Sequence, residues 1–283
     1  MSTSGWPDTL REQALFIERT SGKVAWQFAE AIAGLVNSDD APELIQLPRD
    51  ACVVFHPLIP DWSKAISWGL QGAVEEEEVK QVEELFSERG FTPCCWLSPF
   101  HDETFARLLG SRGWQIAGWQ QMLIRPLSTE DPSRKTHEGI EIRETEDLDD
   151  WANLIAEGFG ASKHQESNQE YLIHRGFAEL PFVRCYVAKV DGEPAGAASL
   201  MLLDGMVNII AASVLPRFRR RGIHHALIDH RLAIAAGEGY HVATYSCDPG
   251  SVSQKNAEGM GFRVLYTRAT MIHAVDRESK GMG

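Results

Sequence analysis

An arginine-rich loop is the part of the sequence best suited to chemistry. Four of the five residues from Arg217 to Arg221 are arginines, and no acidic residue occurs from Val214 to Ile228. The run lies between a predicted buried strand and a predicted helix that begins near Gly222. Because the free N–H groups and the dipole of a helix N-terminus favour an anion, and glycine lets the backbone approach a ligand closely, the pattern indicates a pyrophosphate site. A solvated basic loop is the alternative.

Hydrophobic patterning predicts the elements that position this loop. Three apolar runs, at residues 182–190, 195–203 and 206–215, are separated by Asp191-Gly192 and Asp204-Gly205, which are strong hairpin signals. We therefore expect an antiparallel meander of three strands. A strand, helix, strand crossover after the loop predicts one parallel pair. The other expected elements are a strand at 139–144, helices at 146–159, 168–179, 222–237 and 251–260, and strands at 240–246 and 262–272.

The order helix, strand, helix, strand occurs twice, in residues 79–127 and 225–273. A Gly-aromatic pair follows both helices of each copy, at offsets of 149 and 148 residues: Gly90-Phe91 and Gly113-Trp114, then Gly239-Tyr240 and Gly261-Phe262. The shared order and spacing favour an internal duplication, with a chance match of two α/β segments as the alternative. A polar stretch with Pro132 separates the copies. We expect a domain at 1–127, a linker at 128–138 and a domain at 139–283.

The first copy has no counterpart of the arginine loop. Glu75 to Glu78 precede its matching helix, where acidic residues stabilise the helix end and repel a pyrophosphate. A phosphate-bearing ligand is therefore expected in the second half. Most tryptophans of the first half are expected in the core, and one or two could shape a ligand pocket at the domain cleft. They are Trp26, Trp62, Trp68, Trp96, Trp114 and Trp119.

The arginine loop and its surrounding elements, over about Gly139 to His273, resemble the GCN5-related N-acetyltransferase (GNAT) superfamily. That family carries R/Q-x-x-G-x-G/A before a helix, and the run Arg219-Arg220-Arg221-Gly222-Ile223-His224 fits it except for its last small position. The resemblance implies an α/β (α+β) fold of two GNAT-like domains, each a mixed, mostly antiparallel twisted sheet flanked by helices. It also implies acetyl-CoA as cosubstrate. The coenzyme-binding residues it implies are Ser213, Val214 and Leu215 for the pantetheine arm, Arg219, Arg220, Arg221, Gly222, Ile223, His224, His225 and Ala226 for the pyrophosphate, and Asn256, which could instead bond to nearby backbone.

The catalytic residues carry over less well. In the family an amine attacks the thioester directly, a backbone N–H polarises the carbonyl, and a tyrosine in N-x-x-A-x-x-L-Y-x-x-x-G-F protonates the thiolate. Here Gly250 and Ala257 stand where the Asn and the Tyr belong. Tyr245 is the substitute acid, with a role in packing as the alternative. Glu157 is the candidate base, with a solvated carboxylate at a helix end as the alternative.

Composition limits the class of protein. The 283 residues are 43% apolar and 24% charged, and the net charge of −13 argues against an extended nucleic-acid surface. No apolar stretch is long enough for a membrane span, and the N-terminus lacks a signal pattern, so we expect a cytoplasmic protein that binds no membrane. Five scattered cysteines without a CxxC pair predict free buried thiols and no metal site.

The sequence therefore predicts an acetyl-CoA-dependent N-acetyltransferase whose second domain binds the donor. A sensor that binds acetyl-CoA without turnover is the second hypothesis, and a nucleic-acid contact through Arg217 to Arg221 is the third. The acceptor stays open between a small-molecule amine and a protein amine, although the acidic net charge mildly favours a cationic one. The chain could be a monomer or a homodimer.

Overall fold

The computed structural model describes residues 6–128, 137–161 and 169–273. Most of the predicted linker, residues 129–136, lies outside the described part of the chain. The first half contains α1 (Leu10–Ala33), β1 (Glu43–Gln46), β2 (Cys52–Phe55), β3 (Lys64–Ile66), α2 (Glu76–Glu88), β4 (Cys94–Leu97), α3 (Phe105–Ser111) and β5 (Trp114–Pro126). The second half contains β6 (Ile140–Glu144), α4 (Leu148–Phe159), α5 (Gln169–Ala178), β7 (Val183–Val190), β8 (Glu193–Leu203), β9 (Met206–Asn208), β10 (Ala212–Val214), α6 (Ile223–Gly237), β11 (Val242–Cys247), α7 (Val252–Gly259) and β12 (Arg263–His273).

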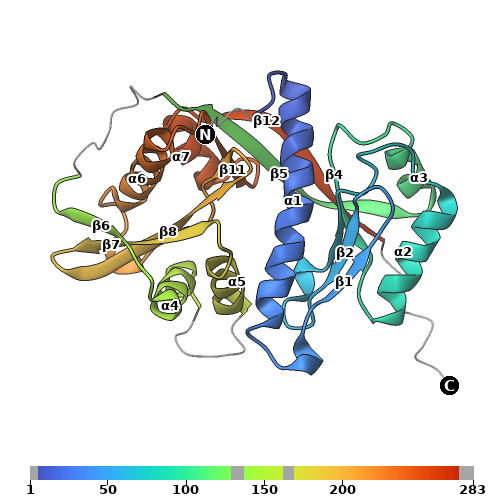
Figure 1. The fold of residues 1–283 in the computed structure, drawn as a ribbon, viewed down its shortest axis with the longest axis horizontal. Coiled ribbons are helices and arrows are strands. Elements are labelled where there is room, and N and C mark those ends of the chain that lie inside the picture. Colours follow the sequence, from blue (N-terminus) through green and yellow to red (C-terminus); the bar gives the residue numbers. More distant parts are fainter. Residues whose placement is uncertain (1–5, 129–136, 162–168, 274–283) are drawn as a thin grey trace.

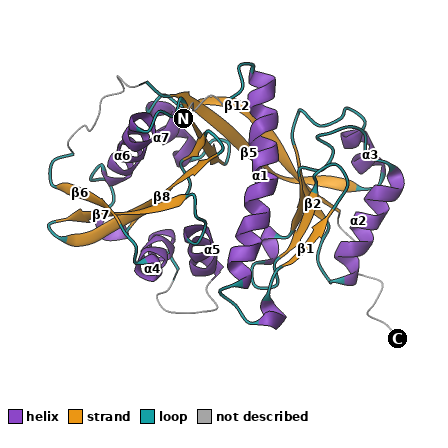
Figure 2. Ribbon diagram, viewed as in Figure 1, coloured by secondary structure: helices purple, strands orange, loops and turns teal. Residues whose placement is uncertain are grey.

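The described strands form one twelve-stranded sheet flanked by helices (Figure 2). Its order is β1-β2-β3-β4-β12-β5-β11-β9-β8-β7-β6, and β10 pairs with β8 off this path. Most pairs are antiparallel, whereas β3 with β4 and β9 with β11 are parallel. The predicted fold class, with a mostly antiparallel mixed sheet, and the predicted parallel pair are confirmed. The two copies also show the predicted order, α2-β4-α3-β5 and α6-β11-α7-β12.

The last strand of each half pairs with the sheet of the other half. β5 lies beside β11, and β12 lies beside β4, while β5 and β12 pair with each other along most of their length. This exchange joins the halves across the centre of the molecule (Figure 1). The domain limits at 127 and 139 stay a prediction, and the sheet does not end at either of them.

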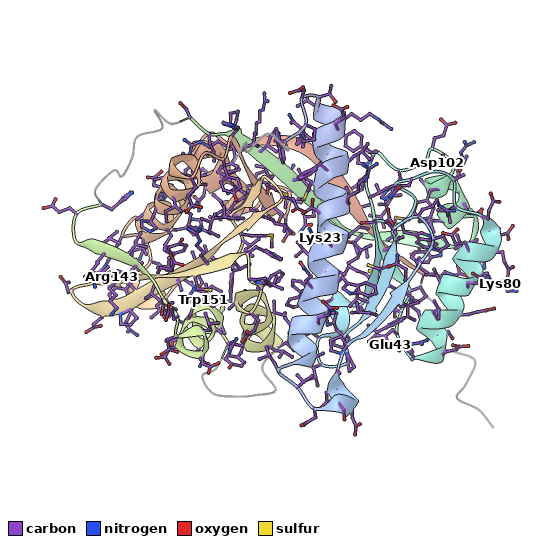
Figure 3. The ribbon with its side chains drawn as sticks, in the orientation of Figure 1. Lys23, Glu43, Lys80, Asp102, Arg143 and Trp151 are labelled. Atoms are coloured by element: carbon purple, nitrogen blue, oxygen red, sulfur yellow. The ribbon has the colours of Figure 1, made fainter. Side chains whose placement is uncertain are left out.

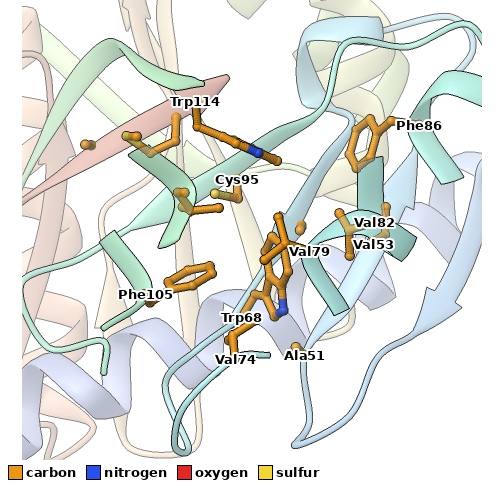
Figure 4. Close-up of a cluster of buried hydrophobic side chains, with 14 of the residues drawn as sticks. Ala51, Val53, Trp68, Val74, Val79, Val82, Phe86, Cys95, Phe105 and Trp114 are labelled. Atoms are coloured by element: carbon orange, nitrogen blue, oxygen red, sulfur yellow. The ribbon is translucent and has the colours of Figure 1, made fainter. Parts of the chain in front are cut away.

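The cores explain why the exchanged strands are placed in this way. β5 begins with Trp114 in the core of the first half, which is built around Trp68 and Phe105 (Figure 4), and reaches Leu123 in the core of the second half. In β12 the direction is reversed, because Met271 packs in the first core and Phe262, just before the strand, packs in the second. Each strand therefore buries apolar surface in both halves, and separating the halves would expose it.

Helix α1 crosses the sheet between the two halves (Figure 1). Thr9 and Glu12 form a capping box at its start. Further along, the buried Glu18 carboxylate accepts hydrogen bonds from the Tyr266 hydroxyl, at 2.5 Å, and from Arg268, at 3.5 Å. The ring of Phe28 on α1 stacks on the ring of Phe177 on α5, with centroids 4.5 Å apart. Helix α1 is therefore tied to strands and helices of the second half.

One sequence prediction was wrong in detail. The expected strand at 206–215 is two strands, β9 and β10, because the backbone turns at Ala211, whose φ of 36° is left-handed. A continuous apolar run cannot reveal such a break, since a straight strand and a bent one bury the same residue types. The two Asp-Gly turns are confirmed, because φ is positive at Asp191, Gly192, Asp204 and Gly205.

All five cysteines are free, and four of them are buried, as predicted. Among the described residues, no three His, Cys, Asp or Glu side chains are placed to hold a metal ion. None of the described helices has the length and apolar character that a membrane span requires.

Candidate active site

At the break between β9 and β10 the sheet of the second half splits, so that β10 and β11 diverge. β9 runs parallel to β11 only at Val207 and Asn208, and the last bond between them runs from the N–H of Ile209 to the carbonyl of Thr244, at 3.1 Å. Beyond that point β10 turns to pair with β8. Within the described part of the chain, no strand pairs with the other edge of β10. Backbone groups on this edge are therefore placed to pair with an extended ligand.

A buried arginine holds this opening. Arg231 on α6 is fully buried, and its Nη1 donates to the carbonyls of Ser199, at 2.7 Å, and Ile210, at 3.0 Å. Burial lowers the pKa of the Arg231 guanidinium to about 9. Because these carbonyls belong to β8 and to the break itself, Arg231 fixes the bend that separates β10 from β11. Sequence reasoning missed this residue, since nothing marks it in a helix of mixed composition.

The arginine loop leads into the open end of α6. Gly222 precedes the helix with a φ of 78°, and Arg220 has a φ of 64°, which is strained for a residue with a side chain. Among the described residues no side chain caps this end, and the first bond of the helix runs from Ala226 to Gly222, at 3.0 Å. The N–H groups of the first turn therefore have no acceptor within the helix, and the exposed Arg220 and Arg221 immediately precede this turn in the chain.

The arginines differ in their contacts. Arg219 donates to the carbonyls of Val214, at 3.2 Å, and Gly158, at 2.9 Å, so it fixes the loop against the end of α4. Arg221 lies over the ring of Phe218, with 5.5 Å to the centroid. Arg220 and Arg221 are exposed and form no ion pair with any described residue, so their charge is available to a ligand. The predicted pyrophosphate role of this loop stays a prediction that its geometry favours.

Other predicted coenzyme residues are placed as follows. Ser213 is buried against α4, where a side chain at Gly158 would come within 2.2 Å of its Oγ. The N–H of Leu215 donates to Ala195, at 2.9 Å, so that group is already used. His225 is exposed at the start of α6, and Asn256 is half-buried on α7 away from the cavity described next. His224 is half-buried and lines the central cavity.

A cavity of about 620 Å³ lies between the halves and reaches the break in β9–β10. Its wall includes the break itself, from Asn208 to Ala212, and the side chains of both halves. Of the six tryptophans considered above, Trp62, Trp96 and Trp119 line it, whereas Trp68 and Trp114 are in the core of the first half. The sequence predicted one or two such rings at a pocket between the halves, and the structure places three there.

Tyr245 lines this cavity and also packs in the core. Its ring is 7% exposed and lies 5.6 Å from that of Phe262, while its hydroxyl is 2.7 Å from the Oγ of Ser253. Both interpretations of Tyr245 therefore describe part of its environment. The hydroxyl, with a second hydroxyl beside it, is a possible route for a proton to the cavity.

Glu157 lies elsewhere. It lines a separate pocket of about 550 Å³ with Arg143, Asp150 and Arg217, and it is not among the residues of the central cavity. The structure therefore does not bring Glu157 together with Tyr245. Its role as a base stays a prediction without support from this placement.

Several polar residues of the cavity were not singled out from the sequence, among them Asn208, His56 and Lys64. Asn208 ends β9 and has a buried Oδ1 with no partner among the described residues, so it can accept a hydrogen bond from a ligand. Burial lowers the pKa of His56 to about 4, and burial with the charges of Arg231 and His225 does the same for His224. Both rings are therefore neutral near pH 7. Lys64 from β3, the third of these residues, also lines the cavity.

Residues 148–262 match the model of the acetyltransferase (GNAT) family. Similar solved structures include the GCN5-related N-acetyltransferase from Kribbella flavida, at 14% identity and a TM-score of 0.61, over 90% of this chain and 95% of that one. A tandem GNAT protein from the clavulanic acid biosynthesis pathway has 12% identity and a TM-score of 0.61, over 80% and 79%. The GCN5-related N-acetyltransferase from Sphaerobacter thermophilus has 16% identity and a TM-score of 0.56, over 78% and 79%. No curated protein sequence matches.

The fold is therefore of the GNAT class, in the tandem form that joins two related halves. The match at residues 148–262 is to the family that the resemblance named, and it supports acyltransferase activity in general.

Proposed function

We propose that the protein is an acetyl-CoA-dependent N-acetyltransferase, in which the second half binds the donor and the central cavity binds the amine. The observation that carries this proposal is the alignment of two open sites. The unpaired edge of β10 leads from the central cavity toward the uncapped, basic N-terminus of α6. An extended ligand with a phosphate at one end and a reactive group at the other fits this arrangement.

The chain offers a partner for each part of such a donor. Arg220, Arg221 and the N–H groups of the first turn of α6 would bind the pyrophosphate. The free backbone edge of β10, including that of Ser213 and Val214, would pair with the amides of the pantetheine arm. The thioester would then lie at the break in β9–β10, which Arg231 holds open.

The cavity supplies polar groups for acyl transfer. The nitrogen of the neutral amine forms a bond to the carbonyl carbon while the C–S bond breaks. The nitrogen then loses a proton to solvent, and the leaving thiolate takes up a proton to become the free thiol of coenzyme A. An N–H at the strand break would polarise the carbonyl, and the Oδ1 of Asn208 would accept a hydrogen bond from the incoming amine. The Tyr245 hydroxyl would protonate the sulfur and regain a proton through Ser253.

The test is release of free thiol from acetyl-CoA with a panel of amines, after calorimetry has established that acetyl-CoA binds. We expect one molecule of acetyl-CoA per chain and turnover with at least one class of amine. Binding without thiol release from any amine would support a sensor, and no binding of acetyl-CoA would overturn both hypotheses.

A further inference from the structure

One wall of the central cavity carries two cations and an aromatic ring on neighbouring strands. Lys64 on β3, Trp96 on β4 and Arg268 on β12 lie on the same face of the sheet, because side chains of a strand alternate and Ala65, Cys95 and Ala269 fill the core on the other face. The Lys64 ammonium is 4.9 Å from the centroid of the Trp96 ring, and the Arg268 guanidinium is 3.5 Å from it.

The charge of Arg268 is balanced within the protein. Its side chain is buried, lies 3.5 Å from the Glu18 carboxylate, and donates to Gln120 from Nε, at 3.0 Å. Arg268 therefore has partners before any ligand arrives, and it fixes the orientation of the Trp96 ring.

Lys64 has no such partner. No described carboxylate lies within ion-pair distance of its ammonium, and the contact that the structure gives it is the ring of Trp96. Burial lowers the pKa of Lys64, and the nearby charge of Arg268 lowers it further, against an opposite effect of Cys94 and of Asp61. A half-buried ammonium that faces a cavity without a counter-ion is a binding site for an anion.

The rest of the cavity provides no competing negative charge in its interior. Asp248 is the one carboxylate among the described lining residues, and it is exposed after the end of β11. Next to the cations the wall is apolar, with the rings of Phe28, Trp62 and Phe177 in mutual contact at 4.5 to 5.6 Å. The cavity is thus locally cationic in a protein of net charge −13.

We propose that the acceptor amine carries a carboxylate on an apolar body, and that Lys64 binds this carboxylate beside Trp96 while the amine faces the strand break. This inference rests on the proposed function, because it assigns the acceptor to the same cavity. The proposed acceptor differs from the cationic acceptor that the net charge of the protein favours. Net charge is a property of the whole surface, whereas Lys64 would contact the ligand directly. The first half would thus select the acceptor, and the second half would bind the donor.

The first experiment measures binding without coenzyme, by quenching of tryptophan fluorescence. The probes are phenylalanine, phenylalaninamide and phenethylamine, together with 6-aminohexanoate and hexylamine. We expect each carboxylate to bind at least about 10-fold more tightly than its analogue without a carboxylate, which corresponds to one charge-assisted contact. Equal binding within both sets would overturn the proposal, and so would no binding of either carboxylate.

The second experiment tests the residue. Lys64→Met should remove the preference for the carboxylate, and Lys64→Arg should retain most of it. Lys80→Met is the matched control, because Lys80 lies at the outer surface of α2, where its ammonium is 4.0 Å from Glu84 (Figure 3). A preference unchanged in a folded Lys64→Met protein would overturn the proposal. If that variant does not fold, the proposal is tested by the unmodified protein alone, through its binding of the carboxylates compared with their analogues that lack a carboxylate.

The two proposals can fail separately. Carboxylate binding that depends on Lys64, without thiol release from acetyl-CoA, would support the anion site and overturn the proposed transferase activity. Rapid acetylation of amines without an acid group, at a rate that Lys64→Met does not change, would support the transferase activity and overturn the proposal that the acceptor carries a carboxylate.

Discussion

The N-termini of α2 and α6 occupy equivalent places in the two copies, and they use the same helix end in opposite ways. At α2 two of the acidic residues contact other side chains of the first half. Glu78 accepts a hydrogen bond from the indole of Trp68, at 2.7 Å, and pairs with Arg49, at 2.5 Å, while Glu76 pairs with Arg112, at 3.1 Å. Like α6, helix α2 has no side-chain cap among the described residues, but its first turn carries carboxylates that favour the positive end of the helix and are paired within the fold.

At α6 the situation is reversed. Arg220 and Arg221 are exposed, the helix is uncapped, and Gly222 lets the loop turn into it. Under the proposed function, the same helix end contributes to stability in the first copy and binds a ligand in the second.

Removal of the Tyr245 hydroxyl should have the largest effect, because β4, the strand of the first half that matches β11, carries no tyrosine. Tyr245→Phe should lower turnover by about 10²–10⁴-fold and leave the affinity for acetyl-CoA unchanged. Steady-state kinetics and calorimetry measure the two quantities. Tyr240→Phe is the control, since Tyr240 does not line the cavity. Normal turnover in Tyr245→Phe would assign this residue to packing alone.

Replacing Arg220 and Arg221 together with Ala should weaken binding of coenzyme A by about 10- to 100-fold, because two charged contacts to phosphate are lost. Binding of a pantetheine fragment that lacks the pyrophosphate should stay unchanged, and so should the melting temperature. Arg143→Ala, in the same half but outside the loop, serves as the control. Equal losses for both ligands would show that the loop had changed shape.

Low pH should destabilise both halves, because each half contains a histidine whose pKa is lowered by burial. His56 and His224 have folded pKa values of about 4, below the ordinary value of 6.5, so the unfolded chain takes up their protons first as the pH falls. The free energy of unfolding should therefore decrease from about pH 6.5 downward, by roughly 1–2 kcal/mol per histidine at pH 5, and this loss levels off below about pH 4. Urea unfolding at pH 7 and pH 5 measures it.

The variants His56→Gln and His224→Gln isolate these groups from the carboxylates that also titrate. Each variant should lose less stability between pH 7 and pH 5 than the unmodified protein does. An identical loss would mean that these rings titrate normally in the folded protein.

The smallest effect is expected at α2. Glu78→Gln removes the charge that pairs with Arg49 but keeps an oxygen for the indole of Trp68, so the free energy of unfolding should fall by about 1 kcal/mol. Affinity for acetyl-CoA should not change, in contrast to the arginine variant. A change in this affinity would place a coenzyme contact in the first half and end the contrast between the two helices.

Local sequence determined the elements and the prediction of a donor-binding loop. Apolar periodicity located the helices and strands, Asp191-Gly192 and Asp204-Gly205 fixed two hairpins, and the run before α6 predicted an anion site. These features depend on residues close together in the chain, where backbone preference and helix-end chemistry act directly.

Tertiary structure decided what local pattern cannot express. A strand has the same alternation whichever strand lies beside it, so the exchange of β5 and β12 was invisible in the sequence. The exchange places Arg268 of the last strand beside Trp96 of the first half, and it encloses the cavity into which Lys64 points. The bend at Ala211 depends in turn on Arg231, twenty residues later. Such contacts join residues far apart in the chain, and only the folded sheet brings them together.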